Sequence, residues 1–176
     1  QPEIILNETR KTIIERLKKD GSAEGGKDGM DCTLISFVPK ALGIKNKQLH
    51  IANANNPVWI VRNSLVPFEE GGRGEIIEIK PDKMPVGKHD KDKEPFTLKI
   101  VDVLDGDIVY ALTDGFPDQF GGEKGKKFMT KNLKELLTAN AYLPINEQKQ
   151  ILETTFKNWL GNLEQVDDIT FVGIRI

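Results

Sequence analysis

The chain has 176 residues, of which 38% are hydrophobic and 30% are charged, with both signs mixed along the sequence. This is the composition of a globular domain in water, and it excludes an intrinsically disordered chain. The apolar runs are far shorter than the roughly 20 residues of a membrane-spanning helix, and a net charge of −2 gives no general attraction to nucleic acid.

The first predicted element is an amphipathic helix over residues 2–20. Its apolar residues recur at helical spacing, and they are Leu6, Ile13, Ile14 and Leu17. The next segment, 22–29, is rich in glycine and charge and predicts a loop.

Six strands are predicted between residues 32 and 112, from short runs rich in Val, Ile, Thr and Phe. The runs are separated by Gly, Pro, Asn and Asp, and their spacing favours antiparallel hairpins over βαβ units. Asp105-Gly106 is a strong hairpin signal and 70–74 is a looser one. The predicted strands are 32–38, 48–52, 58–62, 75–80, 96–104 and 107–112.

Two helices and a strand complete the predicted elements. Thr130 and Asn146 are suited to begin the helices as N-caps, and Gly161 is suited to end the second one. The last run, 169–176, is apolar on both faces, which predicts an interior strand.

Acidic residues stand at two strand boundaries. Asp114 follows the apolar run 108–112, whereas Asp167 and Asp168 precede the final strand. If the two strands are antiparallel neighbours, Asp114 and Asp167 converge at one edge of the sheet. Two such carboxylates would share a proton or bind a cation, and Mg²⁺ or Mn²⁺ prefers oxygen ligands. On spacing alone, a turn and a strand-entry pair are the more frequent explanation.

Two motifs carry a resemblance to a known family. Residues 112–118, Leu-Thr-Asp-Gly-Phe-Pro-Asp, resemble the Thr-Asp-Gly motif of the type 2C metal-dependent protein phosphatases (PPM), in their SpoIIE branch. Residues 165–170, Gln-Val-Asp-Asp-Ile-Thr, are similar to the closing signature of that family. Segments of similar sequence at 28–31, 52–57, 83–87 and 118–122 extend the resemblance over residues 1–176. Among the members of the family, the sequence most resembles Bacteroidetes-like ones.

This resemblance implies an α+β fold, a four-layer α/β/β/α sandwich of two mainly antiparallel sheets flanked by helices. It also implies hydrolysis of phosphoserine or phosphothreonine by water that two Mn²⁺ or Mg²⁺ ions activate. Asp114 and Asp167 would be the catalytic metal ligands, and Asp168 would support them without coordinating. Asp118 stands where some relatives hold an extra ion, although a plain turn acid is equally expected there.

One departure from the family pattern concerns its first metal motif, a Gly-Asp followed shortly by Gly-His-Gly. Nothing here matches it, and His50 and His89 lie in other contexts. The chain begins with Gln1, so we expect an N-terminal truncation that removes this motif and the upstream strands. We therefore expect weak metal binding, little or no phosphatase activity, and unpaired sheet edges that favour a homodimer.

Other suggestive residues have simpler explanations. The lysine-rich run 121–127 lacks the glycine spacing of a P-loop and is expected to form a flap beside the site. Cys32 is expected to be a buried, inert thiol, and Trp59 and Trp159 are expected in the core. The asparagines before Pro57 suit a tight turn, with a substrate contact as the alternative.

The family resemblance also implies partners. A phosphorylated regulatory protein, such as an antagonist of an anti-sigma factor, would be the substrate, and upstream sensor domains of the same polypeptide would control this output domain. With a single cysteine, the chain is expected in the cytoplasm, or as the cytoplasmic part of a membrane-bound sensor. The alternative is a catalytically inactive phosphatase-fold module for protein–protein signalling. Retention of both Asp114 and Asp167 favours the enzyme.

Overall fold

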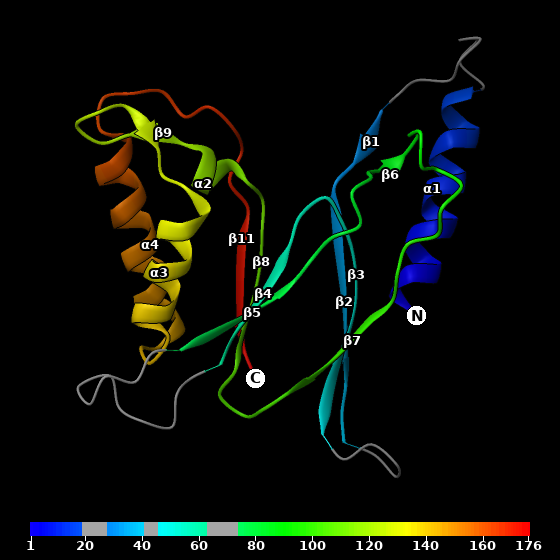
Figure 1. Ribbon diagram of the computed structural model, residues 1–176, viewed down its shortest axis with the longest axis horizontal. Coiled ribbons are helices and arrows are strands. Elements are labelled where there is room, and N and C mark those ends of the chain that lie inside the picture. The colour runs from blue at the N-terminus through cyan, green and yellow to red at the C-terminus, as the bar shows by residue number, and fades with distance from the viewer. Residues whose placement is uncertain (19–27, 41–45, 63–73) are drawn as a thin grey trace. The chain divides into compact units, whose positions relative to one another are not determined.

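The computed structural model describes residues 1–18, 28–40, 46–62 and 74–176 of the chain (Figure 1). Residues 22–27 of the predicted loop 22–29 and residues 70–73 of the predicted turn 70–74 lie outside the described residues. The chain divides into two units, Gln1–Val58 with Ile79–Leu104 and Trp59–Glu78 with Asp105–Ile176. None of the described helices is long and apolar enough to cross a membrane.

The first unit joins one helix to a three-stranded antiparallel sheet. The helix is α1 (Pro2–Lys18), and the sheet has the order β2 (Cys32–Val38), β3 (Lys47–Ala54), β7 (Lys99–Val103). A short second ladder pairs β1 (Gly29–Met30) with β6 (Val86–Gly87). The apolar cluster that contains the inner face of α1 consists of Leu6, Ala52, Ala54, Met84, Val86 and Phe96.

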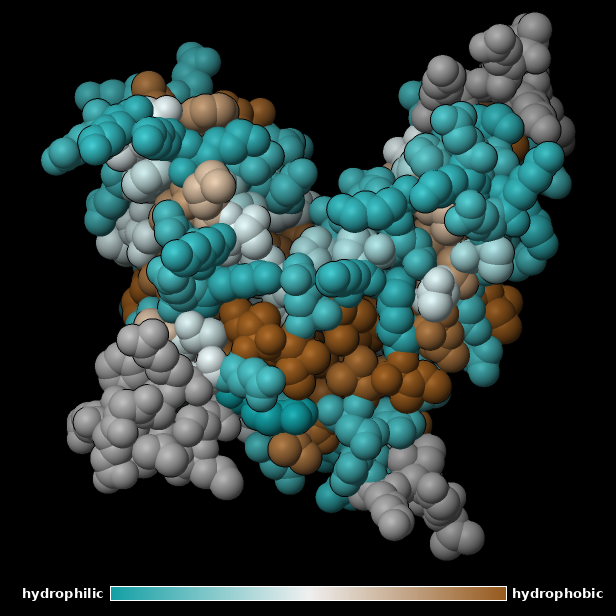
Figure 2. All heavy atoms as spheres, viewed as in Figure 1, coloured by the Kyte–Doolittle hydropathy of each residue, from teal (hydrophilic) through white to brown (hydrophobic). Residues whose placement is uncertain are grey.

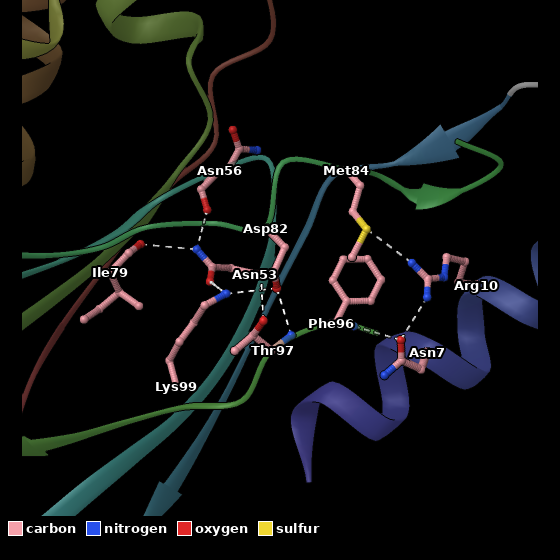
Figure 3. Close-up of polar contacts among 10 residues, drawn as sticks. All are labelled: Asn7, Arg10, Asn53, Asn56, Ile79, Asp82, Met84, Phe96, Thr97 and Lys99. Carbon is pink, nitrogen blue, oxygen red and sulfur yellow. Dashed lines mark hydrogen bonds and ion pairs between the residues drawn. The ribbon is translucent and has the colours of Figure 1, made fainter. Parts of the chain in front are cut away.

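A buried arginine fixes α1 within this unit. The Arg10 guanidinium donates to Asn7 Oδ1 at 3.1 Å and to Met84 Sδ at 3.4 Å (Figure 3). It also donates to the backbone oxygen of Glu94 at 2.7 Å. It also lies 4.8 Å from the centre of the Phe96 ring. Because every contact is local to the unit, Arg10 is a packing residue and no candidate for binding a phosphorylated ligand.

A second polar network surrounds Asn53, which is fully buried. Its Nδ2 donates to the backbone oxygen of Asn56 at 2.7 Å, and its Oδ1 accepts from Lys99 Nζ at 3.2 Å (Figure 3). Lys99 also pairs with Asp82 at 3.0 Å. Asn55 has a φ of 59°, as a tight turn requires. The turn expected before Pro57 is therefore confirmed.

The second unit packs two long helices against a four-stranded sheet. The strand order is β11 (Phe171–Arg175), β8 (Ile108–Leu112), β4 (Val58–Arg62), β5 (Glu75–Ile79). The short helix α2 (Gly115–Asp118), the hairpin of β9 (Phe120–Gly121) and β10 (Lys126–Lys127), and the helices α3 (Thr130–Asn140) and α4 (Ile145–Leu160) follow β8 in the chain. The apolar core contains Trp59, Tyr110, Leu112, Phe116, Leu133 and Leu137, with Trp159 packed against it.

Several sequence predictions are confirmed, including α1, the strands 32–38 and 58–62, and Trp59 as a core residue, whereas Trp159 is partly buried and packs against the core. Gly161 ends α4 as predicted, with a φ of 57° and its N–H bonded to Lys157 O, but the two predicted N-caps, Thr130 and Asn146, are wrong. Met129 precedes α3, because the backbone N–H of Met129 bonds to Pro117 O and fixes the helix entry. Pro144 precedes α4, since its carbonyl accepts the N–H groups of Glu147 and Gln148.

The predicted hairpin at Asp105-Gly106 is also wrong. Gly106 does turn the chain, with a φ of 92°, but β7 pairs with β3 whereas β8 pairs with β11. A bond of 3.0 Å from Gly106 N to Ile176 O holds this turn at the end of β11 instead. The predicted strand 96–104 begins only at Lys99, because the Phe96 N–H bonds to Asn7 on α1.

The final strand was predicted to be interior, and this is wrong within the described part of the chain. There β11 lies at the edge of its sheet, with β8 as its one strand partner. Val172 and Ile174 are 47% and 40% exposed. Hydrophobic residues also appear among the hydrophilic ones on the face of the molecule in Figure 2. The sequence of β11 is thus typical of an interior strand, although β8 is its one neighbour among the described strands.

Candidate metal centre

The two acidic segments meet where β8 ends and β11 begins. The strands are antiparallel, with Leu112 opposite Phe171, and they lie side by side in Figure 1. Beyond this pair, the N–H of Thr113 donates to Thr170 O at 3.0 Å. The register places the Asp114 segment beside the Asp167-Asp168 segment, which is the adjacency that the sequence predicted.

Thr113 and Gly115 hold these segments close together. Thr113 Oγ1 donates to the backbone oxygen of Asp168 at 3.1 Å and accepts from the N–H of Thr170 at 3.0 Å. A Cβ atom at Gly115 would lie 2.5 Å from Asp168 O, which is closer than any real Cβ contact. Glycine is thus required at position 115 for the two backbones to approach this closely.

The carboxylates themselves lie on the surface. Asp114, Asp167 and Asp168 are exposed, and Asp114 makes no side-chain capping bond to α2. Asp167 Oδ1 accepts the N–H of Asp168 at 2.7 Å, which orients that carboxylate. Exposed carboxylates with spare oxygen lone pairs are suited to bind a hard cation.

Asp118 has a different environment from the other three acids. Its Oδ2 lies 2.9 Å from Lys127 Nζ on β10, and both side chains are about half exposed. The pair joins α2 to the hairpin of β9 and β10. The role of Asp118 as a ligand stays a prediction, and any cation there would compete with Lys127.

The model of the family described as Stage II sporulation protein E (SpoIIE) matches residues 1–176. The chain belongs to the SpoIIE family. No curated protein sequence matches it significantly. Among solved structures, the SiaA-PP2C domain of Pseudomonas aeruginosa is 25% identical with a TM-score of 0.76. The match covers 99% of this chain and 61% of that one, so this SpoIIE-family chain spans less than two thirds of the relative.

Two structures of SpoIIE from Bacillus subtilis share the fold. Its phosphatase domain presoaked with manganese matches at a TM-score of 0.54 and 14% identity, over 98% of this chain and 70% of that one. A PP2C phosphatase domain with a regulatory-domain fragment matches at 0.52 and 14%, over 76% and 35% of the two chains. The predicted family and the α+β fold with antiparallel sheets are therefore confirmed.

The donor chemistry of this SpoIIE site fits part of a metal centre. Asp114 and Asp167 offer the hard oxygen ligands that Mg²⁺ and Mn²⁺ prefer. Within the described ranges, however, no three His, Cys, Asp or Glu side chains are grouped to hold a metal. These residues therefore fit a cation as part of a larger donor set, and do not complete a two-metal site.

The other candidate residues lie in structural roles. His89 Nδ1 accepts the N–H of Lys91 at 3.1 Å, and His50 lies within β3. Cys32 is a free, partly buried thiol in β2, and burial raises its pKa, which favours the inert form. The predicted flap is a hairpin anchored to α4, since Gly122 N donates to Trp159 O at 2.8 Å.

Sequence reasoning missed one residue of this region, Gln119. It is fully buried and bonds to the segment that carries Asp167. A glutamine between an aspartate and a phenylalanine gives no periodic signal, so only its place within the 118–122 motif could have drawn notice.

Proposed function

We propose that this chain belongs to a metal-dependent protein-serine/threonine phosphatase that removes phosphate from a regulatory protein in bacterial signalling. One observation carries the proposal, namely that the Asp114 and Asp167 segments adjoin at the ends of neighbouring antiparallel strands. The SpoIIE family match and the likeness to a PP2C domain over 99% of the chain support it.

In this proposal, Asp114 and Asp167 bind divalent cations, with the N–H of Asp168 orienting the Asp167 carboxylate. Bound cations would neutralise charge on the phosphoryl oxygens and lower the pKa of water, so that hydroxide would be available near neutral pH to attack phosphorus and displace the serine or threonine oxygen. Manganese is the first ion to test, because the phosphatase domain of Bacillus subtilis SpoIIE was presoaked with it. Exposed Lys126 and Lys127 on β10 would attract a phosphorylated surface.

The proposed setting follows from the same family membership. The substrate would be a phosphoserine or phosphothreonine protein such as an anti-sigma factor antagonist, and sensor domains of the same polypeptide would control the activity. We place the domain in the cytoplasm. A homodimer through an open sheet edge completes the proposed partners.

Manganese-dependent phosphate release from phosphoserine and phosphothreonine peptides tests this function. We expect Asp114→Asn and Asp167→Asn each to lower the rate at least about 100-fold, since each removes a ligand charge. Asp102→Asn is the matched control, because Asp102 is an exposed carboxylate of the first unit. If phosphate release by this chain is below the detection limit, the same substitutions are tested in a longer polypeptide that contains a Gly-Asp-x-x-Gly-His-Gly sequence. Equal rates in all variants would contradict the proposal.

A second candidate function is a phosphatase-fold module that signals by protein–protein contact without catalysis. The observation that favours it is the lack of any group of three metal-ligating side chains among the described residues. Absence of manganese-dependent release in both the chain and the longer polypeptide would support this candidate over the enzyme.

A further inference from the structure

Gln119 lies where the two acidic segments come together. It follows the last residue of α2, the short helix that starts directly after Asp114. Although glutamine is polar, this side chain has no exposed surface. A buried amide is stable only when its donors and acceptors are bonded, so its partners show what it holds.

The carboxamide of Gln119 bonds on both sides to the loop before β11. Its Nε2 donates to Glu164 O at 3.0 Å, and its Oε1 accepts the N–H of Val166 at 3.1 Å. The second Nε2 hydrogen goes to Phe120 O at 2.9 Å. The Gln119 side chain therefore binds the backbone at two positions, Glu164 and Val166, and the second of these immediately precedes Asp167.

The backbone of Gln119 is itself held firmly. Its carbonyl accepts Trp159 Nε1 at 3.0 Å and the N–H of Phe128 at 2.9 Å. The clamp is thus attached to α4 and to the chain that enters α3, and both belong to the packed core.

Within the loop that Gln119 clamps, Gln165 Nε2 donates to Asp167 O at 2.7 Å and the N–H of Asp168 donates to Asp167 Oδ1 at 2.7 Å, but neither bond ties the loop to the core. Residues 164–168 are exposed and lie in neither a helix nor a strand. Thr113 provides the other attachment, through its bonds to Asp168 O and to the N–H of Thr170. Asp114 lies between Thr113 and Gln119 in the chain, and Asp167 lies between the backbone groups that these two residues bind.

We propose that Gln119 is a positioning residue that sets the separation of Asp114 and Asp167 and thereby the affinity of the site for a divalent cation. The proposal rests on the proposed function in taking these two aspartates as metal ligands. Outer partners that orient metal ligands typically change affinity by about 10- to 100-fold when they are removed.

The test compares Gln119→Met with wild type by Mn²⁺ titration, following the electron paramagnetic resonance signal of the free ion. Methionine keeps the length of the side chain but bonds neither Glu164 O nor the Val166 N–H. We expect Mn²⁺ affinity to fall about tenfold or more. We also expect faster hydrogen exchange at the Val166 amide without metal, because its acceptor is lost.

Gln148→Met is the matched control. Gln148 is 3% exposed and also makes two side-chain bonds, but these join α4 to the Tyr110 hydroxyl on β8 and to Leu143 O in the connection before α4. We expect this variant to lose comparable thermal stability while its Mn²⁺ affinity stays within about twofold of wild type.

Each outcome decides the inference. Equal Mn²⁺ affinity in Gln119→Met and wild type would overturn it, as would an equal loss in Gln148→Met, which would indicate general destabilisation. If the wild type binds no Mn²⁺, the proposed metal site fails. The exchange rate at Val166 then still decides the clamp, and an unchanged rate overturns it.

Discussion

The close approach of the two acidic segments depends on a glycine, Gly115, which has no side chain to separate them. Gly115 faces the backbone oxygen of Asp168 at a distance that no Cβ atom tolerates, and Thr113 bonds the same oxygen. The pair of residues that flanks Asp114 therefore determines where the opposite segment lies. This makes the Thr-Asp-Gly sequence a packing requirement as well as a proposed ligand motif.

Gly115→Ala tests this at the scale of one residue. The added methyl must push Asp168 away, because the atom it meets belongs to the backbone. We expect a loss of about 1–3 kcal/mol in the free energy of unfolding and clearly weaker Mn²⁺ binding. Denaturant unfolding and a Mn²⁺ titration measure the two effects.

Gly106→Ala is the control for this substitution. Its methyl would meet nothing within 4 Å, but its φ of 92° is strained for alanine. We expect a stability loss of about 1 kcal/mol with unchanged Mn²⁺ binding. Unchanged metal binding in Gly115→Ala would show that the close approach does not matter to the site.

At this scale the sequence predicted the acids but not their support. The adjacency of the Asp114 and Asp167 segments could be predicted because strand ends and motif order mark them, and the role of the two aspartates as metal ligands stays a prediction. Gln119 was missed, since its importance comes from burial and from the two side-chain bonds that it makes to Glu164 O and to the Val166 N–H, far away in the sequence. A bonding pattern between residues distant in sequence leaves no local signature.

At the scale of elements, one buried hydrogen bond ties the sheet to its covering helix. The Tyr110 hydroxyl on β8 donates to Gln148 Oε1 on α4, and the Tyr110 ring packs 5.5 Å from that of Phe171 on β11. Burial raises the pKa of Tyr110 to about 12, a shift that Arg175 opposes. Tyr110 thus joins three elements, and its neutral form is the stable one.

This predicts a loss of stability in alkaline solution. The pKa is raised in the folded state from the unfolded value of about 10, so the stabilisation is complete below pH 10 and is lost as pH rises through 12. At pH 12 we expect Tyr110 to contribute about 2–3 kcal/mol less to the free energy of unfolding than at pH 9. Denaturant unfolding between pH 9 and 12 measures this difference. Tyr110→Phe should lack this component, and an identical pH profile in that variant would contradict the assignment.

Elements with a clear pattern of their own were predicted well, such as the strand 32–38 and the first helix. Errors arose where partners from elsewhere in the chain decide the outcome. The Asp105-Gly106 turn connects strands of two different sheets, because β8 pairs with β11 and β7 pairs with β3. Turn residues specify a change of direction but not the strand that pairs next.

At the scale of the whole molecule, the most unusual feature is the apolar strand β11, which lies at the edge of its sheet among the residues that the structure describes. Antiparallel alternation directs the peptide groups of Phe171, Gly173 and Arg175 away from β8. A groove of about 650 Å³ lies between α4 and β11, lined in part by Leu152, Phe156 and Phe171. Such an edge is suited to pair with a further strand.

We expect this edge to mediate the proposed homodimer. If two copies pair antiparallel about Gly173, Val172 of each copy lies opposite Ile174 of the other. The double change Val172→Lys with Ile174→Lys should then abolish dimers, because like charges oppose. Val172→Lys with Ile174→Glu should restore them through opposite charges. Sedimentation equilibrium measures the mass against the 19.7 kDa of one chain, and a wild type that is monomeric at all concentrations would contradict this expectation.

The most direct test is whether the carboxylates of Asp114 and Asp167 bind the same cation. We would measure Mn²⁺ affinity for wild type, Asp114→Asn, Asp167→Asn and the double variant. If one ion bridges both side chains, each single change should remove most of the affinity and the second should add little, so the losses are strongly non-additive. Additive losses, or single variants that bind Mn²⁺ as tightly as wild type, would contradict a shared metal site.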